Sequence, residues 1–243
     1  MTHSDKAALR GEPSYVWRSG QERRLAMVAK WTNLSGMVLD HGCGLGSYME
    51  KFTAFGGSVF GFDVEEDRLQ LAIPRGNGVN LAVGETLPYP DNTFDTLFSN
   101  EVMEHVADDA KTASEMIRVL KPGGRVLIFC PNRWNPYEQH GIYWRGKYKF
   151  GNIPLVNYLP DVLRDQLAWH VRAYTKRGLM RLFKGQPVKT VHYERVFGGY
   201  DNIERRLPKF GRTLRQTLYR LENTPLDFWG LSHLLVLEKT VVK

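Results

Sequence analysis

Short apolar runs, rich in β-branched and aromatic residues, alternate with helical patterns between residues 37 and 130. The runs are MVLD at 37–40, SVFGFD at 58–63, VNLAV at 79–83, FDTLFS at 94–99 and RVLIFC at 125–130. Strands that alternate with helices are typical of a parallel, doubly wound sheet. We therefore predict an α/β fold with five parallel strands in this part of the chain.

Two of the intervening segments, 48–55 and 107–120, have helical spacing. The second leads into Lys121-Pro122-Gly123-Gly124, and proline and glycine end helices. The leading segment, 14–31, has a helical pattern as well. We expect it to form a lid helix over a ligand site, with ordinary packing on the core as the alternative.

The pattern changes after Pro131, where residues 132–161 carry many aromatic, glycine and cationic residues without a clean period. We predict a substrate-facing insertion here, or else a loop packed on the core. The residues that favour a pocket for an anionic, partly apolar acceptor are Trp134, Tyr137, Tyr143, Trp144, Tyr148 and Tyr158, with Arg133, Arg145, Lys147 and Lys149 between them.

The remainder of the chain predicts a helix at 175–184, a strand at 189–196, a basic segment at 204–222 and a last strand at Ser232–Lys239. These two strands would add two edge strands to the five parallel strands, giving a mostly parallel seven-stranded sheet. The length of 243 residues fits one domain. We divide it into a lid helix at 1–34, a ligand-binding core at 35–132, and the insertion with the edge strands at 133–243.

Composition limits the class of protein. No stretch reaches the roughly 18 apolar residues of a membrane span, and residues 1–13 lack the apolar run of a secretory signal. We therefore expect a cytoplasmic protein.

The sequence has two cysteines, Cys43 and Cys130, which fit neither a disulfide framework nor a metal pattern. We expect both to be buried and no metal to be bound.

The net charge of +7 is unevenly distributed. Residues 1–120 hold 11 Lys and Arg against 17 Asp and Glu, a balance of −6, whereas residues 121–243 hold 22 against 9, a balance of +13. A positive surface attracts an anionic substrate, a nucleic acid or an anionic membrane, although charge runs are often simply solvated.

A glycine-rich turn follows the first predicted strand, with Asp40 at the strand end and Gly42, Gly44 and Gly46 after it. Glycine permits positive φ and lets a ligand approach the backbone. A dinucleotide site would have G-x-G-x-x-G, but Ser47 occupies the third glycine position. The turn therefore favours another cofactor, or a tight turn without a ligand.

Acidic and small residues follow the next strands. Asp63 ends the second strand, where a carboxylate can accept hydrogen bonds from both hydroxyls of a ribose, although it could also cap the next helix. The third strand leads into GETLPYPDNTFD and the fourth into SNEVMEHV. Ligands of open α/β sheets bind at this edge, beyond the carboxyl ends of the strands.

Together, D-x-G-x-G-x-G at 40–46, the acid at Asp63, LPYPDNTFD, EVMEHV and LKPGG resemble the class I S-adenosylmethionine (SAM)-dependent methyltransferases. The resemblance covers residues 35–132 and is greatest to the small-molecule methyltransferases of quinone and lipid metabolism, the type 11 group. It implies a Rossmann-like fold and SAM as cofactor. The glycine loop would hold the methionine part, Asp63 the ribose, Gly84 and Glu85 the adenine, and Asn100 would lie near the methionine end. The cofactor residues expected are thus Asp40, Gly42, Cys43, Gly44, Gly46, Asp63, Val64, Gly84, Glu85 and Asn100.

One position departs from the family pattern. Relatives place an aspartate facing the adenine amino group, and this chain has Val83 there. Adenine recognition would then depend on backbone groups, on Glu85 or on another side chain.

The sulfonium methyl of SAM is already activated, so a protein needs mainly to align the nucleophile, and a base only where the acceptor must lose a proton. Histidine suits that role near neutral pH. His140 in the insertion is the first candidate base and His105 after the fourth strand the second, with no dedicated base as the alternative. Glu138 could orient His140.

We thus predict an enzyme that methylates a hydroxyl, in preference to a nitrogen or carbon, of a small or lipid-like anionic acceptor. The alternatives are a nucleic-acid (RNA) methyltransferase, a non-catalytic SAM-binding or membrane-surface protein, and an NAD-dependent oxidoreductase. We do not expect nucleic acid, because SNEV lacks the N-P-P-Y pattern of enzymes that methylate amino groups. Peripheral membrane contact would use Leu214, Leu218 and Leu221, which share one helical face in the basic segment.

Overall fold

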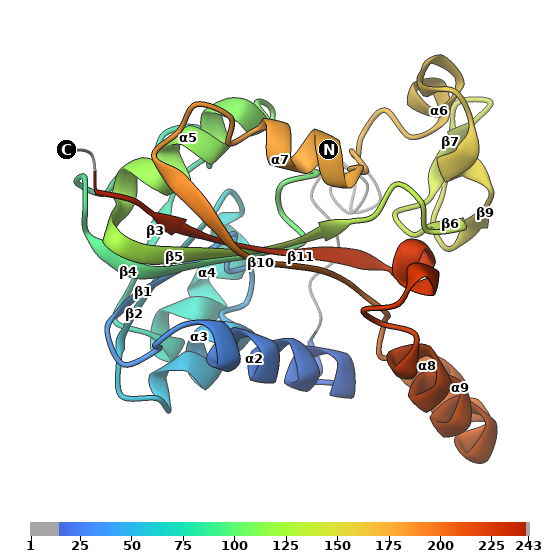
Figure 1. Ribbon diagram of the computed structural model, residues 1–243, viewed down its shortest axis with the longest axis horizontal. Coiled ribbons are helices and arrows are strands. Elements are labelled where there is room, and N and C mark those ends of the chain that lie inside the picture. Colours follow the sequence, from blue (N-terminus) through green and yellow to red (C-terminus); the bar gives the residue numbers. More distant parts are fainter. Residues whose placement is uncertain (1–14, 242–243) are drawn as a thin grey trace.

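A computed structural model of the chain, which describes residues 15–241, has a central sheet in the order β10-β11-β5-β4-β1-β2-β3 (Figure 1). Its strands are β1 Met37–His41, β2 Ser58–Asp63, β3 Gly78–Leu81, β4 Phe94–Asn100, β5 Leu120–Pro131, β10 Val188–Val196 and β11 Ser232–Lys239. The strands from β1 to β5 pair in parallel, and β11 runs antiparallel to both of its neighbours. The mostly parallel seven-stranded sheet is thereby confirmed, with one correction: of the two strands predicted to add edges, β11 lies inside the sheet and β10 alone is at an edge, while β3 forms the opposite edge.

Helices cover both faces of the sheet (Figure 1). On one face lie α2 Ser19–Trp31, α3 Ser47–Thr53 and α4 Glu66–Ala72, which is followed by the short η1 Ile73–Arg75. On the other face lie α5 Asp109–Val119 and α7 Lys176–Arg181. Each face of the sheet has its own apolar cluster. The strands of a parallel sheet are buried on both faces, so helices pack on each face. The two layers hold the carboxyl ends of β1, β2 and β4 in fixed positions.

Local sequence sets the helix limits. The Asp108 side chain accepts a hydrogen bond from the backbone N–H of Lys111 and caps α5, which is a preferred role of aspartate. Leu120 adopts extended backbone and begins β5, so the helix ends one residue before the limit that its spacing predicts.

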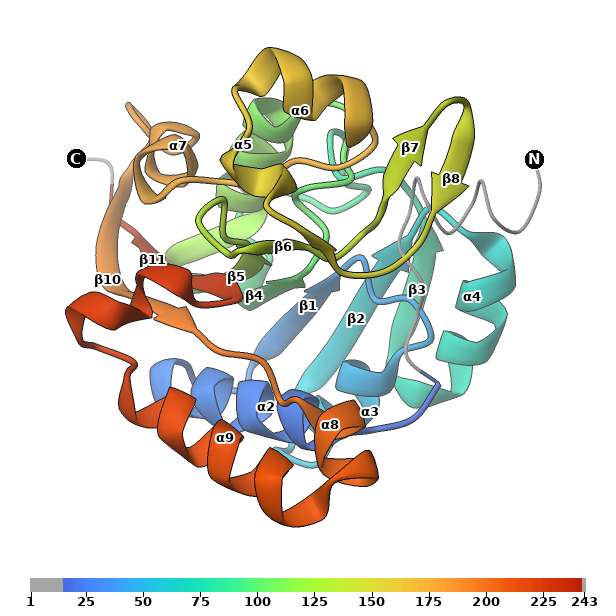
Figure 2. The same cartoon turned by 90° about the vertical axis from the view of Figure 1, so that its right-hand side faces the viewer.

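The segment predicted as an insertion folds into small paired strands over the carboxyl edge of the sheet (Figure 2). It contains β6 Tyr137–Glu138, β7 Ile142–Trp144, β8 Lys147–Lys149, β9 Ile153–Pro154, η2 Val156–Tyr158 and α6 Asp161–Leu167. Strand β6 pairs with β9, and β7 pairs with β8.

The basic segment forms α8 Asp201–Arg206 and α9 Pro208–Arg220, followed by η3 Pro225–Trp229. Helices α8 and α9 lie along α2 (Figure 2), where Arg23 forms an ion pair with Glu222 and stacks 3.7 Å over the ring of Tyr219. The leucines of the predicted membrane-facing stripe, Leu214, Leu218 and Leu221, are half-buried. The stripe is therefore largely used in packing.

None of the helices between residues 15 and 241 combines the length and the apolarity needed to cross a bilayer. The expectation about a secretory signal concerns residues 1–13, which lie outside the described part of the chain.

Candidate active site

A cavity of about 1320 Å³ opens at the carboxyl ends of β1, β2 and β4. It is lined by every cofactor residue predicted from the sequence except Gly46, and by both candidate bases, His105 and His140. Helix α2 contributes one wall through Arg24, while Leu25 and Val28 of the same helix pack in the core. The segment expected as a lid is thus both a packing helix and part of the cavity wall.

The three glycines of the loop have φ values of 70° at Gly42, 53° at Gly44 and 73° at Gly46, in the left-handed region that favours glycine. Their surroundings differ. A Cβ at Gly42 would lie 2.5 Å from a methyl group of Val102, and one at Gly46 would lie 3.0 Å from Ala72. A Cβ at Gly44 would have no described atom within 4 Å. Gly44 therefore presents bare backbone to open space, whereas Gly42 and Gly46 allow close packing.

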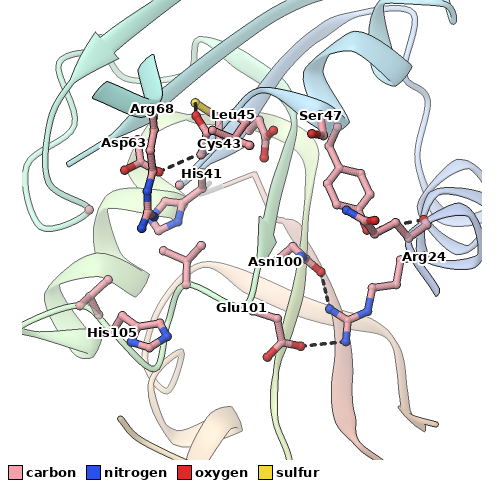
Figure 3. A pocket seen from close by; sticks show the side chains of 18 of the residues that line it. Arg24, His41, Cys43, Leu45, Ser47, Asp63, Arg68, Asn100, Glu101 and His105 are labelled. Carbon is pink, nitrogen blue, oxygen red and sulfur yellow. Dashed lines mark hydrogen bonds and ion pairs between the residues drawn. The ribbon is translucent and has the colours of Figure 1, made fainter. Parts of the chain in front are cut away.

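Asp63 connects the end of β2 to this loop (Figure 3). One carboxylate oxygen accepts a hydrogen bond from the backbone N–H of Gly44 at 2.9 Å, and the other accepts one from that of Glu65 at 3.0 Å. Each carboxylate oxygen has two lone pairs and can accept more than one hydrogen bond. The two bonds hold the carboxylate in place at the cavity wall, where a pair of hydroxyl groups would meet it.

Asp40 and His41 are buried polar residues at the cavity wall. Asp40 Oδ2 and His41 Nε2 have no hydrogen-bond partner among the described residues. Burial, and after it the charge of Asp63, raises the pKa of Asp40 to about 8, and burial lowers the pKa of His41 to about 3. Buried polar groups are rarely left unpaired, so both atoms indicate a polar ligand in the cavity.

Val83, the residue that stands where relatives have an aspartate, lies at the end of the cavity predicted for adenine. Its side chain is half-exposed, as is that of Val64. Gly84 is close to β1, because a Cβ there would lie 3.0 Å from His41 Nε2. The Glu85 carboxylate accepts hydrogen bonds from the backbone N–H groups of Ala107, at 2.7 Å, and Asp108, at 3.0 Å. Glu85 therefore fixes the start of α5 as well as lining the cavity.

Two residues that no sequence pattern singled out, Arg24 and Glu101, meet opposite the glycine loop (Figure 3). The Arg24 guanidinium donates to Asn100 Oδ1 and lies 2.8 Å from Glu101 Oε1. Burial acts to raise the pKa of Glu101, but the positive charge of Arg24 outweighs it and holds that pKa below its usual range. The E-V-M-E-H pattern could have drawn attention to Glu101, but no local signal marks Arg24.

His140 is oriented by a buried ion pair in the insertion. Its Nδ1 lies 3.2 Å from Glu138 Oε1, and Arg164 donates to the other carboxylate oxygen of Glu138 at 2.7 Å. Burial opposes ionisation of Glu138, but the hydrogen bond and charge of His140, together with Arg164, lower its pKa to about 2. An ionised carboxylate only accepts hydrogen bonds, so Nδ1 of His140 carries a proton, and in the neutral form of the ring Nε2 has the lone pair.

Nε2 of His140 lies 3.7 Å from Oε1 of Glu104, and Nε2 of His105 lies 4.0 Å from the same oxygen. The two imidazole rings meet edge to face with centroids 5.2 Å apart. Glu104 is only 1% exposed, and burial together with the neighbouring Glu101 raises its pKa well above the usual range. The two histidines singled out by the sequence are thus neighbours around a carboxyl group that it did not single out.

The aromatic and cationic residues of the insertion largely do not line the cavity, contrary to the pocket predicted for them. Of that set only Tyr148 reaches it. Trp134 stacks on Phe228, and Arg133 forms an ion pair with Asp161 at 2.8 Å. Contact between apolar rings is favourable because it removes their surface from water. These rings pack on one another and on η3 but belong to neither core cluster, and Trp134, Tyr137, Trp144 and Tyr158 are 36–49% exposed.

Residues 39–128 match the family model described as a methyltransferase domain. These residues form a type 11 methyltransferase domain of class I. Phosphoethanolamine N-methyltransferase 1 of Zea mays is 33% identical over 141 residues, which are 53% of this chain and 28% of that protein. The demethylmenaquinone methyltransferase of Symbiobacterium thermophilum is 32% identical over 154 residues, 57% of this chain and 58% of that protein.

Both matches leave much of each relative unaligned, so they describe the shared domain. The fold extends further. A SAM-dependent methyltransferase structure from Mesorhizobium loti superposes with a TM-score of 0.61, covering 88% of this chain and 96% of that one at 18% identity. The domain thus has the Rossmann-like methyltransferase fold, and its cofactor is SAM.

The cavity fits this cofactor. Gly44 leaves open space beside the backbone, Asp63 can accept from ribose hydroxyls, and Asn100 stands at the other end near Arg24. When bound, SAM supplies a methyl group on a positively charged sulfur, which needs no further activation by the protein.

Proposed function

We propose that this chain transfers the methyl group of SAM to a hydroxyl of a small or lipid-like anionic acceptor. The supporting observation is the orientation of His140 by Glu138 on the cavity wall. A hydroxyl must lose its proton to become a good nucleophile, whereas an unprotonated amine need not. An oriented imidazole with its lone pair on Nε2 suits an acceptor of the first kind.

His140 Nε2 would take the hydroxyl proton as the acceptor attacks. The resulting imidazolium would be stabilised by Glu138, whose carboxylate is held on its far side by Arg164. An ionised carboxylate that fixes the tautomer and stabilises the imidazolium is a recurrent arrangement in proton transfer. The rest of the rate would come from alignment of the two substrates in one cavity.

Arginines favour an acceptor with a negative group. Arg18 and Arg23 of the α2 region and Arg68 of α4 line the cavity. The charge of Arg23 is already paired with Glu222. The support therefore rests mainly on Arg18, whose guanidinium donates to the neutral Asn202. All three arginines belong to the acidic half of the sequence, so the support comes from local placement and not from the overall excess of positive charge in residues 121–243. A phosphate-bearing acceptor gives the Zea mays relative its name, and guanidinium groups bind phosphate and carboxylate well.

A lipid-like acceptor would bring the protein to a membrane surface. Leu207 and Phe210, both 58% exposed at the start of α9, lie beside Arg206 and Lys209 in sequence. Exposed apolar residues next to cations favour an anionic interface. Flotation with anionic and with neutral vesicles tests this contact: enrichment on anionic vesicles that Leu207→Ser and Phe210→Ser abolish supports it, and no enrichment contradicts it.

The test of the activity uses SAM labelled in its methyl group and matched acceptors that carry a phosphate or carboxylate. Each acceptor is offered in a hydroxyl, an amine and a methyl-ether form. Transfer to the hydroxyl form, with little to the amine, is the expected result. Transfer to the amine alone would contradict the hydroxyl assignment while leaving the methyltransferase activity in place.

A further inference from the structure

Glu104 has an unusual environment for a carboxyl group. It is 1% exposed, and neither of its oxygens has a hydrogen-bond partner among the described residues. Its near neighbour Glu101 is already paired with Arg24. Removing a carboxylate from water without compensation is costly, so this position requires a positive group or a proton.

Two imidazoles face the same oxygen. The separations of 3.7 Å from His140 Nε2 and 4.0 Å from His105 Nε2 are too long for hydrogen bonds. They suit three ligands around one ion, because ligand atoms about 2.0–2.2 Å from a metal stand roughly 3–4 Å from one another. The ligand atoms of Glu104, His105 and His140 all lie within 4.8 Å of one another.

The orientation of His140 adds an independent argument. Histidines that bind metals usually donate their other ring N–H to a carboxylate, which fixes the tautomer and raises the basicity of the ligating nitrogen. His140 has this arrangement, with Nδ1 on Glu138 and Nε2 directed toward Glu104. Arg164 in turn fixes Glu138.

We propose that Glu104, His105 and His140 bind a divalent transition-metal ion at the wall of the cavity. Two imidazoles with one carboxylate suit Zn²⁺, Mn²⁺ or Fe²⁺, whereas Mg²⁺ prefers an all-oxygen set. His105 and His140 line the cavity, so an ion bound to both would lie at its wall. The expectation of no metal was drawn from the two cysteines, which take no part in this cluster.

The ion would bind the acceptor hydroxyl and lower its pKa, as bound metals do for water. This role rests on the proposed function, although the binding of the ion does not. His140 then acts as a ligand, and the proton passes from the metal-bound hydroxyl to solvent. Metal dependence therefore distinguishes this assignment from His140 acting as the base by itself.

The test begins with full-length protein stripped of metal by a chelator and titrated calorimetrically with Zn²⁺, Mn²⁺ or Mg²⁺. We expect one equivalent of Zn²⁺ to bind, Mn²⁺ to bind more weakly and Mg²⁺ not to bind measurably. Glu104→Gln and His140→Ala should each lower the affinity for Zn²⁺ by at least about tenfold. Glu138→Gln should lower it by about tenfold through the orientation of His140.

His192→Ala is the matched control, because His192 stacks on Trp31 away from the cavity. Titration of every variant with SAM shows whether the fold and the cofactor site survive. Absorption of bound Co²⁺ in the visible region, lost in Glu104→Gln but kept in His192→Ala, would support the site without any measurement of activity.

Zn²⁺ that binds the wild type no more tightly than Glu104→Gln and His140→Ala would overturn the site. Turnover that survives complete chelation would overturn the catalytic role of the ion and leave His140 as the base. Loss of SAM binding by the wild type would contradict the proposed function instead, so the two failures are distinguishable.

Discussion

The carboxylate of Asp63 accepts a hydrogen bond from the backbone N–H of Gly44, 2.9 Å away, and so fixes the glycine loop to the end of β2. The two residues are 19 positions apart in the chain but meet because β1 and β2 are parallel neighbours in the sheet. Parallel strands bring their carboxyl ends to one edge. The same bond places the negative charge of Asp63 beside the bare backbone of Gly44. The carboxylate is thus available to the ribose of SAM, and the backbone to its methionine part.

Replacing Asp63 by Ala should weaken SAM binding by about tenfold or more. One hydrogen bond to a charged group contributes about 1.5–3 kcal/mol, and the substitution also frees the loop. Equilibrium dialysis with labelled SAM measures the affinity. Glu66→Ala, an exposed change on the adjacent helix, is the control and should have no effect. Equal affinity in Asp63→Ala would place the ribose site elsewhere.

Gly44→Val should abolish detectable SAM binding without unfolding the protein. The new side chain would occupy the open space beside the loop, and its positive φ of 53° would cost about 1–2 kcal/mol. Gly56→Val is a matched control, since Gly56 also has positive φ and open surroundings but does not line the cavity. If both variants bound SAM equally well, the loop would not be the cofactor site.

His140→Ala should lower turnover by about 100- to 10,000-fold while leaving the affinity for SAM unchanged. The reason is that His140 lies on the acceptor side of the cavity, away from the glycine loop, and takes part in removal of the hydroxyl proton as base or as metal ligand. Steady-state rates and SAM titrations on the same preparation separate the two effects. A near-normal rate would exclude His140 from the reaction.

Asp40 should make the ligand-free protein less stable as the pH rises from about 4 to about 8. Its pKa is raised to about 8 in the folded state, mainly by burial, against about 3.9 in an unfolded chain. The folded protein therefore binds the proton more tightly, and that advantage disappears as pH climbs through the folded pKa. Urea unfolding across this range should show a decline that Asp40→Asn lacks. A constant difference between the two proteins would show that Asp40 ionises normally.

Periodicity predicted the central sheet well because each strand is a compact apolar run bounded by turns. The runs at 58–63 and 232–239 coincide with β2 and β11 residue for residue. Their order in the sheet was less accessible. That β11 inserts between β5 and β10 depends on antiparallel pairing over residues more than a hundred positions apart, which no local pattern encodes.

The cofactor end of the site was predictable because its residues follow strand ends in sequence. The acceptor end was not. Arg24 contacts Glu101 from a position 77 residues earlier in the chain. Glu104 becomes part of a candidate site only in the folded protein, where His140 of the insertion lies beside it. In the insertion, composition alone could not show which rings line the cavity: Tyr148 does, whereas Trp134 and Tyr143 contact other rings outside it.

A calorimetric titration of the wild-type protein with SAM and, separately, with NAD shows directly which cofactor this cavity binds. We predict saturable binding of one equivalent of SAM and no measurable heat with NAD, because Ser47 stands where a dinucleotide loop has its third glycine. Binding of NAD without SAM, or of neither, would contradict the assignment of this cavity as a methyltransferase site.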